Sequence, residues 1–156
     1  LGHWVKNRPA GNTPRKTCPV HLERQKQTNP SGMSQTSEPS AQPQEKDCIF
    51  CAIMVGALPA TIIMESENVI AFRDINPQAP LHALVVPRNH YGDIARVAKA
   101  DPALLAEMVS LADEVASEFA DGQYRFIFNS GPNAGQTVFH VHGHVLGGAR
   151  LGWTPA

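Results

Sequence analysis

The 156-residue sequence has no long apolar run. No stretch of roughly 18 apolar residues occurs, so no membrane-spanning helix is predicted, and the first residues lack the apolar core that a secretory signal needs. Cysteine is scarce: the chain has 3, an odd number that is untypical of a secreted disulfide framework. We therefore expect a cytoplasmic protein without a membrane partner.

Strong charge of either sign is also missing from the chain as a whole, whose net charge is 13 − 14 = −1. The charge is unevenly placed, because residues 1–46 carry seven Lys/Arg and three Asp/Glu, which gives +4. Residues 47–156 carry six Lys/Arg and eleven Asp/Glu, which gives −5. A segment of +4 would support only weak, salt-sensitive contact with RNA or DNA, so we expect no specific nucleic-acid partner.

The first 46 residues contain no Ile and no Phe but six prolines. A segment of this kind cannot bury enough apolar surface to offset the entropy lost on ordering. We predict that residues 1–46 form a disordered, basic tail rich in Pro, Ser and Gln, and that residues 47–156 form one domain.

From Asp47 onward the sequence alternates between helix and strand patterns. A short helix is predicted between Asp47 as its N-cap and Gly56 as its C-cap. A longer helix is predicted after Asp101, with Pro102 at its first position and apolar residues at helical spacing up to Phe119. Five strands are predicted, at residues 61–65, 68–73, 82–87, 124–129 and 137–146. Two helices and about five strands joined mostly by short turns predict an α+β fold with an antiparallel sheet.

The segment His140-Val141-His142-Gly143-His144 has a period of two. In a strand this period places the three imidazoles on one face, with successive histidine Cα atoms about 6.6–6.8 Å apart. Three polar rings on one face are costly to bury without partners, so each needs a hydrogen bond, a metal or a ligand. A purely metal-binding site and three structural core histidines are the alternatives at this point.

The surroundings of this run resemble the histidine triad (HIT) superfamily. The motif covers residues 140–148, and the Gly147-Gly148 pair followed by Trp153 looks like the branch of histidine triad nucleotide-binding proteins. Further matching segments follow in the family's order at residues 47–59, 72–82, 85–90 and 129–140, so the resemblance covers about residues 47–156. Gly143 departs from the family, which usually has a bulky apolar residue there, and we expect altered packing on the face opposite the histidines.

This resemblance implies a HIT-like fold joined across a homodimer, with the segment around Trp153 reaching toward the partner's site. It also implies an enzyme that cleaves a P–N or acyl-phosphate bond of a purine nucleoside monophosphate derivative, such as an AMP phosphoramidate. The reaction would pass through a covalent nucleotidyl-histidine. Two alternatives are a dinucleoside polyphosphate hydrolase of the same superfamily and a nucleotide-binding adaptor without catalysis.

The resemblance assigns roles to four histidines. His142 would be the nucleophile, with its other ring nitrogen held by the carbonyl oxygen of His140. His144 would contact a phosphate oxygen and so neutralise charge in the transition state. His82 matches a fourth family histidine near the same site. The expected catalytic residues are therefore His82, His140, His142 and His144.

Nucleotide contacts are expected at several further positions. Glycines in the loop of residues 131–137 leave backbone N–H groups free for an anion, and the resemblance implies that Asp74 binds the ribose hydroxyls. Phe50, Leu58 and Ile75 are candidates to flank the base, although each could equally belong to the core. The complete set is Phe50, Leu58, Asp74, Ile75, Asn129, Gly135, Gln136 and Thr137.

The Cys48-x-x-Cys51 pair is compatible with zinc, with a redox pair or with two buried thiols. A redox pair would fit a thioredoxin-like βαβ pattern, which the sequence lacks. Structural zinc requires four ligands, and the resemblance implies that His90 and His140 complete the set. We therefore expect a structural Zn²⁺.

Overall fold

The structure is a computed structural model that describes residues 47–153, so the predicted tail of residues 1–46 lies outside the described residues. The helices are α1 (Ile49–Met54), α2 (Ile94–Ala100), α3 (Pro102–Phe119) and the short 3₁₀ helix η1 (Pro132–Ala134). The strands are β1 (Ile62–Glu65), β2 (Val69–Arg73), β3 (Leu81–Pro87), β4 (Tyr124–Phe128) and β5 (Gly143–Gly147). No helix within residues 47–153 has the length and apolarity to cross a membrane.

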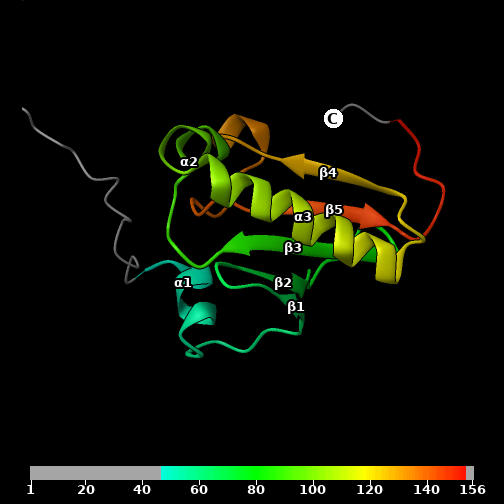
Figure 1. Cartoon of the computed structure of the whole chain (residues 1–156), viewed down its shortest axis with the longest axis horizontal. Helices are drawn as coiled ribbons and strands as arrows, with labels where there is room; N and C mark the ends of the chain where they lie inside the picture. Colours follow the sequence, from blue (N-terminus) through cyan, green and yellow to red (C-terminus); the bar gives the residue numbers. More distant parts are fainter. Residues whose placement is uncertain (1–46, 154–156) are drawn as a thin grey trace, which may run out of the picture. The chain divides into compact units, whose positions relative to one another are not determined.

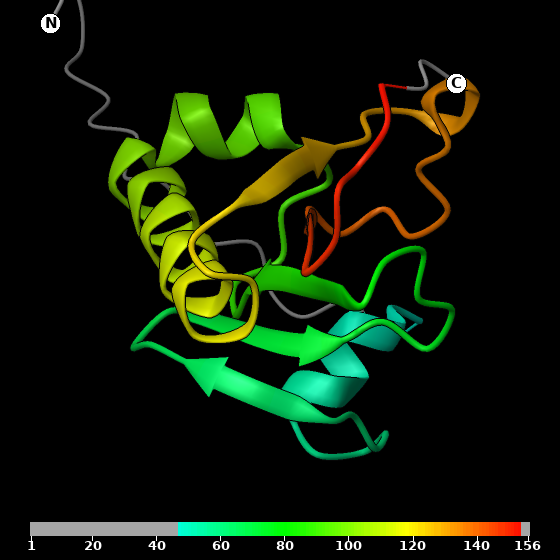
Figure 2. The same ribbon diagram turned by 90° about the vertical axis from the view of Figure 1, so that its right-hand side faces the viewer.

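The five strands form one sheet in the order β1-β2-β3-β5-β4, and every neighbouring pair is antiparallel. Helix α3 lies across one face of the sheet, and α1 lies on the other (Figures 1 and 2). The predicted α+β fold with a five-stranded antiparallel sheet is confirmed.

Strand β3 lies in the middle of the sheet and is buried along its whole length. Ala83 and Val85 pack toward α3, whereas Leu84 and Val86 pack toward α1. A strand covered on both faces has apolar residues at nearly every position, and His82 is the exception that the site below explains.

Helix α3 begins where the sequence predicted. Asp101 Oδ1 accepts a hydrogen bond from the backbone N–H of Leu104 at 3.0 Å, and Pro102 occupies the first helical position. The inward stripe includes Met108, Leu111 and Val115, all of which are buried. This helix supplies most of the apolar surface that covers its face of the sheet.

Three local features differ from the sequence predictions. Helix α2 was not predicted, although Asp93 caps it by accepting the backbone N–H of Arg96 at 2.9 Å. The N-cap of α1 is Cys48 and not Asp47. Strand β5 begins at Gly143 and not at residue 137, because the backbone N–H of Val141 donates to the carbonyl of Tyr91 at 2.6 Å, in a loop outside the sheet.

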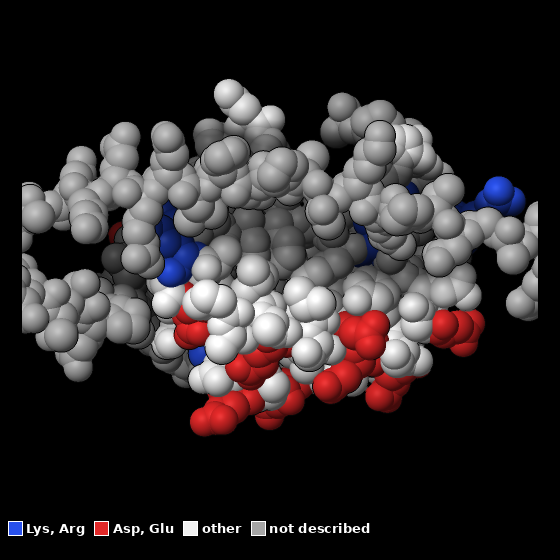
Figure 3. All heavy atoms as spheres, turned by 45° about the horizontal axis from the view of Figure 1, so that its top comes forward, with Lys and Arg blue, Asp and Glu red and all other residues white. Residues whose placement is uncertain are grey.

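Acidic side chains gather on one face of the molecule (Figure 3). The exposed members on α3 and the turn after it are Asp113, Glu114, Glu118 and Asp121, and residues 101–124 contain no Lys or Arg. A negative surface disfavours anionic ligands. An anionic ligand is therefore disfavoured on this face.

The glycine in the histidine run is explained by two phenylalanines of β4. A Cβ atom at Gly143 would collide with the ring of Phe126 and lie 3.0 Å from Cε1 of Phe128. The two rings meet edge to face with their centroids 4.6 Å apart. They fill the space that a bulky side chain at position 143 would need, which is the altered packing expected there.

We expect Gly143→Ala to lower the free energy of unfolding by about 1–3 kcal/mol, because the added methyl group overpacks this space. Urea unfolding would measure the change. Gly152→Ala is the matched control, since nothing lies within 4 Å of a Cβ atom there.

Phe126→Leu should cost less stability in the Gly143→Ala background than in the wild type, because the smaller side chain relieves the collision. Equal costs in both backgrounds would show that the two positions do not share this space.

Candidate active site and metal centre

Cys48, Cys51, His90 and His140 come together beneath α1, and all four are buried. Cys48 Sγ and Cys51 Sγ lie 3.4 and 3.6 Å from His140 Nδ1, and Cys51 Sγ lies 3.4 Å from His90 Nδ1. Zinc bonds of about 2.3 Å to sulfur and 2.05 Å to nitrogen at a tetrahedral angle place S and N about 3.6 Å apart. The four donors therefore fit a Cys₂His₂ zinc site, and their predicted convergence is confirmed.

The ring of His140 is oriented for this role by the main chain. His140 Nε2 lies 2.9 Å from the carbonyl oxygen of Pro87, which can only accept, so Nε2 carries the proton. The Nδ1 lone pair then faces the two sulfur atoms. Burial, with a smaller contribution from neighbouring His90, lowers the pKa of His140 to about 4, which keeps the ring neutral.

The ring of His142 is held by the main chain of the histidine two positions before it. His142 Nδ1 donates to the carbonyl oxygen of His140 at 2.7 Å, which leaves Nε2 with a free lone pair. Phe50 packs edge-on against the ring with a centroid distance of 5.1 Å. Burial lowers the pKa of His142, so at neutral pH this nitrogen is unprotonated.

A cavity of about 640 Å³ opens beside these rings, within the size range of small-molecule sites. Its apolar lining includes Ile49, Phe50, Ile53, Phe72, Ile75, Leu84 and Val138. Its polar lining includes Asp74, Thr137, His142 and His144. An apolar pocket with a few convergent polar groups is the usual form of a ligand site.

Not every predicted base contact lies at this cavity. Phe50 and Ile75 line it, but Leu58 is 44% exposed and does not. The sequence reasoning missed Phe72 and Leu84, which are paired across β2 and β3. The available signal was the alternation of side chains along the predicted strands at residues 68–73 and 82–87.

The loop of residues 129–137 is shaped by the Gln136 side chain, which is only 3% exposed. Its Oε1 accepts the backbone N–H of Gly131 at 2.8 Å, and its Nε2 donates to the carbonyls of Gly92 and Val138 at 2.7 and 3.1 Å. The amide is thus satisfied within the protein. Of the four loop residues predicted as nucleotide contacts, Thr137 lines the cavity, whereas Asn129, Gly135 and Gln136 do not.

His144 and His82 complete the group of histidines. His144 lines the cavity, and burial together with nearby His142 lowers its pKa to about 4. His82 is 5% exposed and lies behind it, with its Nε2 at 2.9 Å from His144 Nδ1. Asp74 Oδ2 lies 3.4 Å from the same His82 nitrogen.

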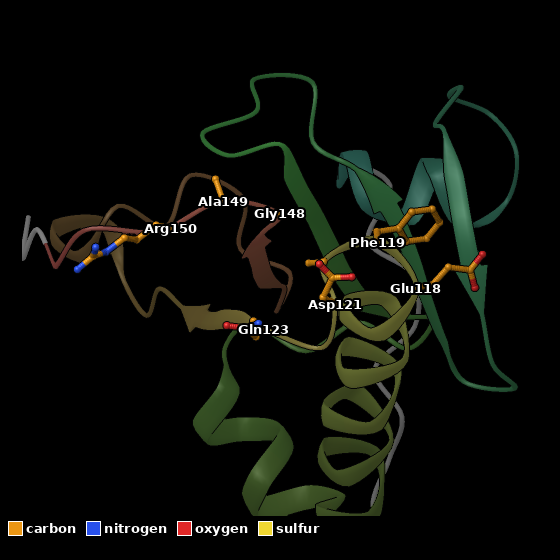
Figure 4. A pocket seen from close by; sticks show the side chains of 8 residues that line it. Glu118, Phe119, Asp121, Gln123, Gly148, Ala149 and Arg150 are labelled. Carbon is orange, nitrogen blue, oxygen red and sulfur yellow. The ribbon is translucent and has the colours of Figure 1, made fainter.

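A second hollow, of about 520 Å³, lies at the C-terminal end of α3 (Figure 4). Its side chains come from the end of α3 and from the segment after β5, and they include Glu118, Asp121 and Arg150. It contains no histidine or cysteine and none of the predicted site residues. This hollow therefore carries none of the candidate chemistry.

An α+β domain with three alternating histidines, of which His142 and His144 line a cavity, has the features of histidine triad proteins. The model of the HIT domain matches residues 55–151. The chain belongs to the HIT domain family.

Similar sequences and a similar crystal structure support this family assignment. An uncharacterized HIT-like protein of Synechocystis is 40% identical over 111 residues, which are 70% of this chain and 97% of the relative. A 14 kDa zinc-binding protein of Zea mays is 41% identical over 112 residues, covering 69% and 86%. The crystal structure of a HIT family hydrolase from Legionella pneumophila matches with a TM-score of 0.67 and 41% identity, covering 70% of this chain and 100% of that one.

We expect the purified protein to contain about one zinc ion per chain and Cys48→Ser or Cys51→Ser to lose most of it, because each substitution removes one of four ligands. Elemental analysis would measure the metal content. Cys18→Ser is the matched control and should retain zinc. Equal zinc in all four proteins would contradict the site.

Proposed function

We propose that this protein is a hydrolase that cleaves a P–N or acyl-phosphate bond of a purine nucleoside monophosphate derivative, such as an AMP phosphoramidate or an acyl-adenylate. The proposal is carried by one observation: His142 Nε2 has a free lone pair beside the cavity because Nδ1 is bound to the carbonyl of His140. The similarity to a HIT family hydrolase supports it.

In the first step, His142 Nε2 attacks phosphorus and the P–N or P–O bond to the leaving group breaks. An amine leaving group takes up a proton from water, whereas a carboxylate leaves as the anion. The ring gains positive charge as the new N–P bond forms. The His140 carbonyl, already bound to Nδ1–H, stabilises that charge. Water then hydrolyses the nucleotidyl-histidine and releases the nucleoside monophosphate.

The nucleotide would lie along the cavity with its base against the apolar side chains that line it, Phe50 and Ile75 among them. Asp74 would accept hydrogen bonds from the ribose hydroxyls; its Oδ1 already holds the backbone N–H of Asn76 at 2.7 Å. The Thr137 hydroxyl would donate to the phosphate. Asn129, Gly135 and Gln136 would form the loop that presents Thr137.

A structural zinc ion would link α1 to the residues that precede β5. A zinc ion held by these four protein ligands would have no open position for substrate, so it would serve to fix the ring of His140. The similarity to a zinc-binding protein of Zea mays supports a bound zinc ion. Because zinc needs the reduced sulfur atoms of Cys48 and Cys51, we propose a reducing compartment such as the cytoplasm.

Removing the nucleophile tests the proposed reaction. His142→Ala and His142→Asn should each lower kcat for an AMP phosphoramidate by roughly 10⁴-fold or more, as loss of a covalent nucleophile does in other enzymes. Steady-state kinetics would measure this, with His21→Ala, a histidine of the N-terminal segment, as the matched control.

The substrate series separates the alternatives. Turnover of diadenosine polyphosphates without turnover of phosphoramidates would favour the dinucleoside polyphosphate hydrolase. AMP binding without turnover of either class would favour an adaptor. Unchanged turnover in the His142 variants would remove the nucleophile assignment.

We also propose that two copies associate through β4, which lies at the edge of the sheet. An edge strand offers unpaired backbone groups to another strand. Near it, Trp153 is 85% exposed, and Arg125 fixes the adjoining segment by donating to the Gly152 carbonyl at 2.7 Å. The exposed indole could then reach the partner.

A homodimer has twice the chain mass of 16.9 kDa. Sedimentation equilibrium at micromolar protein concentration should give this doubled mass. A monomer mass throughout a dilution series would contradict the association.

A further inference from the structure

His82 lies next to the cavity but does not line it. In the sheet, His82 of β3 pairs with Leu146 of β5, so His144 is its diagonal neighbour on the same face. The side chain is 5% exposed and sits behind the ring of His144. Any effect of His82 on a bound nucleotide therefore passes through His144.

The tautomer of His82 is set by a main-chain group. The backbone N–H of Gln78 donates to His82 Nδ1 at 3.1 Å. A nitrogen that accepts a hydrogen bond carries no proton, so the proton of the neutral ring is on Nε2. The loop between β2 and β3 thus determines which nitrogen of His82 is a donor.

The proton on His82 Nε2 in turn determines the tautomer of His144. The nearest acceptor is His144 Nδ1 at 2.9 Å, whereas Asp74 Oδ2 is at 3.4 Å, beyond the usual range of a good hydrogen bond. His144 Nδ1 must then accept. The proton of neutral His144 is consequently on Nε2.

We propose that His82 is a positioning residue that fixes His144 as its Nε2–H tautomer, so that His144 offers a hydrogen-bond donor to the phosphoryl group. The proposal rests on the proposed function for its catalytic consequence. Neighbouring triad members then present opposite polarity: His142 offers a lone pair and His144 an N–H. The other tautomer of His144 would direct a lone pair at a phosphate oxygen and repel it.

The same three side chains also have the separations of a metal site, with Asp74 Oδ2 4.0 Å from His144 Nδ1. A metal on His82 Nε2 would require that nitrogen's lone pair and would move the ring proton to Nδ1. That proton would then face the N–H of Gln78, donor against donor. The hydrogen-bond chain has no such conflict, and for this reason the geometry favours it over a second metal.

NMR of the imidazole nitrogens in the ligand-free protein at pH 7.5 tests the tautomer directly. Long-range ¹H–¹⁵N correlations identify the protonated nitrogen, and the His144 signals are assigned by their loss in His144→Asn. We expect the proton on Nε2 in the wild type. A proton on Nδ1 would overturn the proposal, whether or not the protein turns over a substrate.

Two variants of His82 test the positioning role. In His82→Gln the amide nitrogen takes the approximate place of Nε2 and can still donate, whereas His82→Leu cannot. We expect His82→Leu to lose the preference for Nε2–H on His144 and to lower kcat about 10²-fold, the typical effect of removing one donor to a transition-state oxygen. His82→Gln should retain the tautomer and most of kcat, and KM should change little in either variant.

Zinc content and near-UV circular dichroism would show that both variants fold. An unchanged His144 tautomer and unchanged kcat in folded His82→Leu would overturn the proposal. An active wild type is required for the kinetic comparison only. A wild type that turns over no substrate therefore contradicts the proposed function, and the NMR measurement still decides the role of His82.

Discussion

Hydrogen bonds from the main chain to imidazole rings are the constraint on which the whole site depends. The carbonyl of Pro87 places the proton of His140 on Nε2, and the carbonyl of His140 places that of His142 on Nδ1. Each bond therefore decides which nitrogen has a lone pair to give. Because the ring of His140 faces the cysteines and its carbonyl binds His142, one residue links the metal centre to the cavity.

The two faces of the sheet have different roles: one holds the main core and the other holds the candidate site. The face under α3 holds the larger apolar core, and the helix above it is acidic outside and apolar inside. The face under α1 has a smaller apolar cluster, and it admits the buried histidines because each finds a partner there. Several polar side chains can be buried close together only when each has a hydrogen-bond partner. The site therefore lies on the face where neighbouring groups supply those donors and acceptors.

Many of the helices and strands could be predicted from the sequence, because they depend on residues close together in the chain. Helix α3 has a capping aspartate, a proline and a clear apolar stripe. The predicted strands at residues 61–65 and 68–73 are separated by only two residues, which favours a hairpin of β1 and β2. The meeting of Cys48 with His140, 92 positions apart, has no local signal and followed only from family resemblance. The late start of β5 and the internal role of Gln136 depend on single long-range hydrogen bonds that no period in the sequence reveals.

The packing of Gly143 against Phe126 has a consequence for how sequences in this family vary. The side chain that fills this part of the core need not belong to the histidine run, since here the neighbouring strand supplies it. Positions 126 and 143 then share one fixed volume, and interiors close-packed like crystals do not let both be large. Relatives with a bulky residue at position 143 should therefore have a smaller one at position 126. The two positions should change together as the sequences diverge.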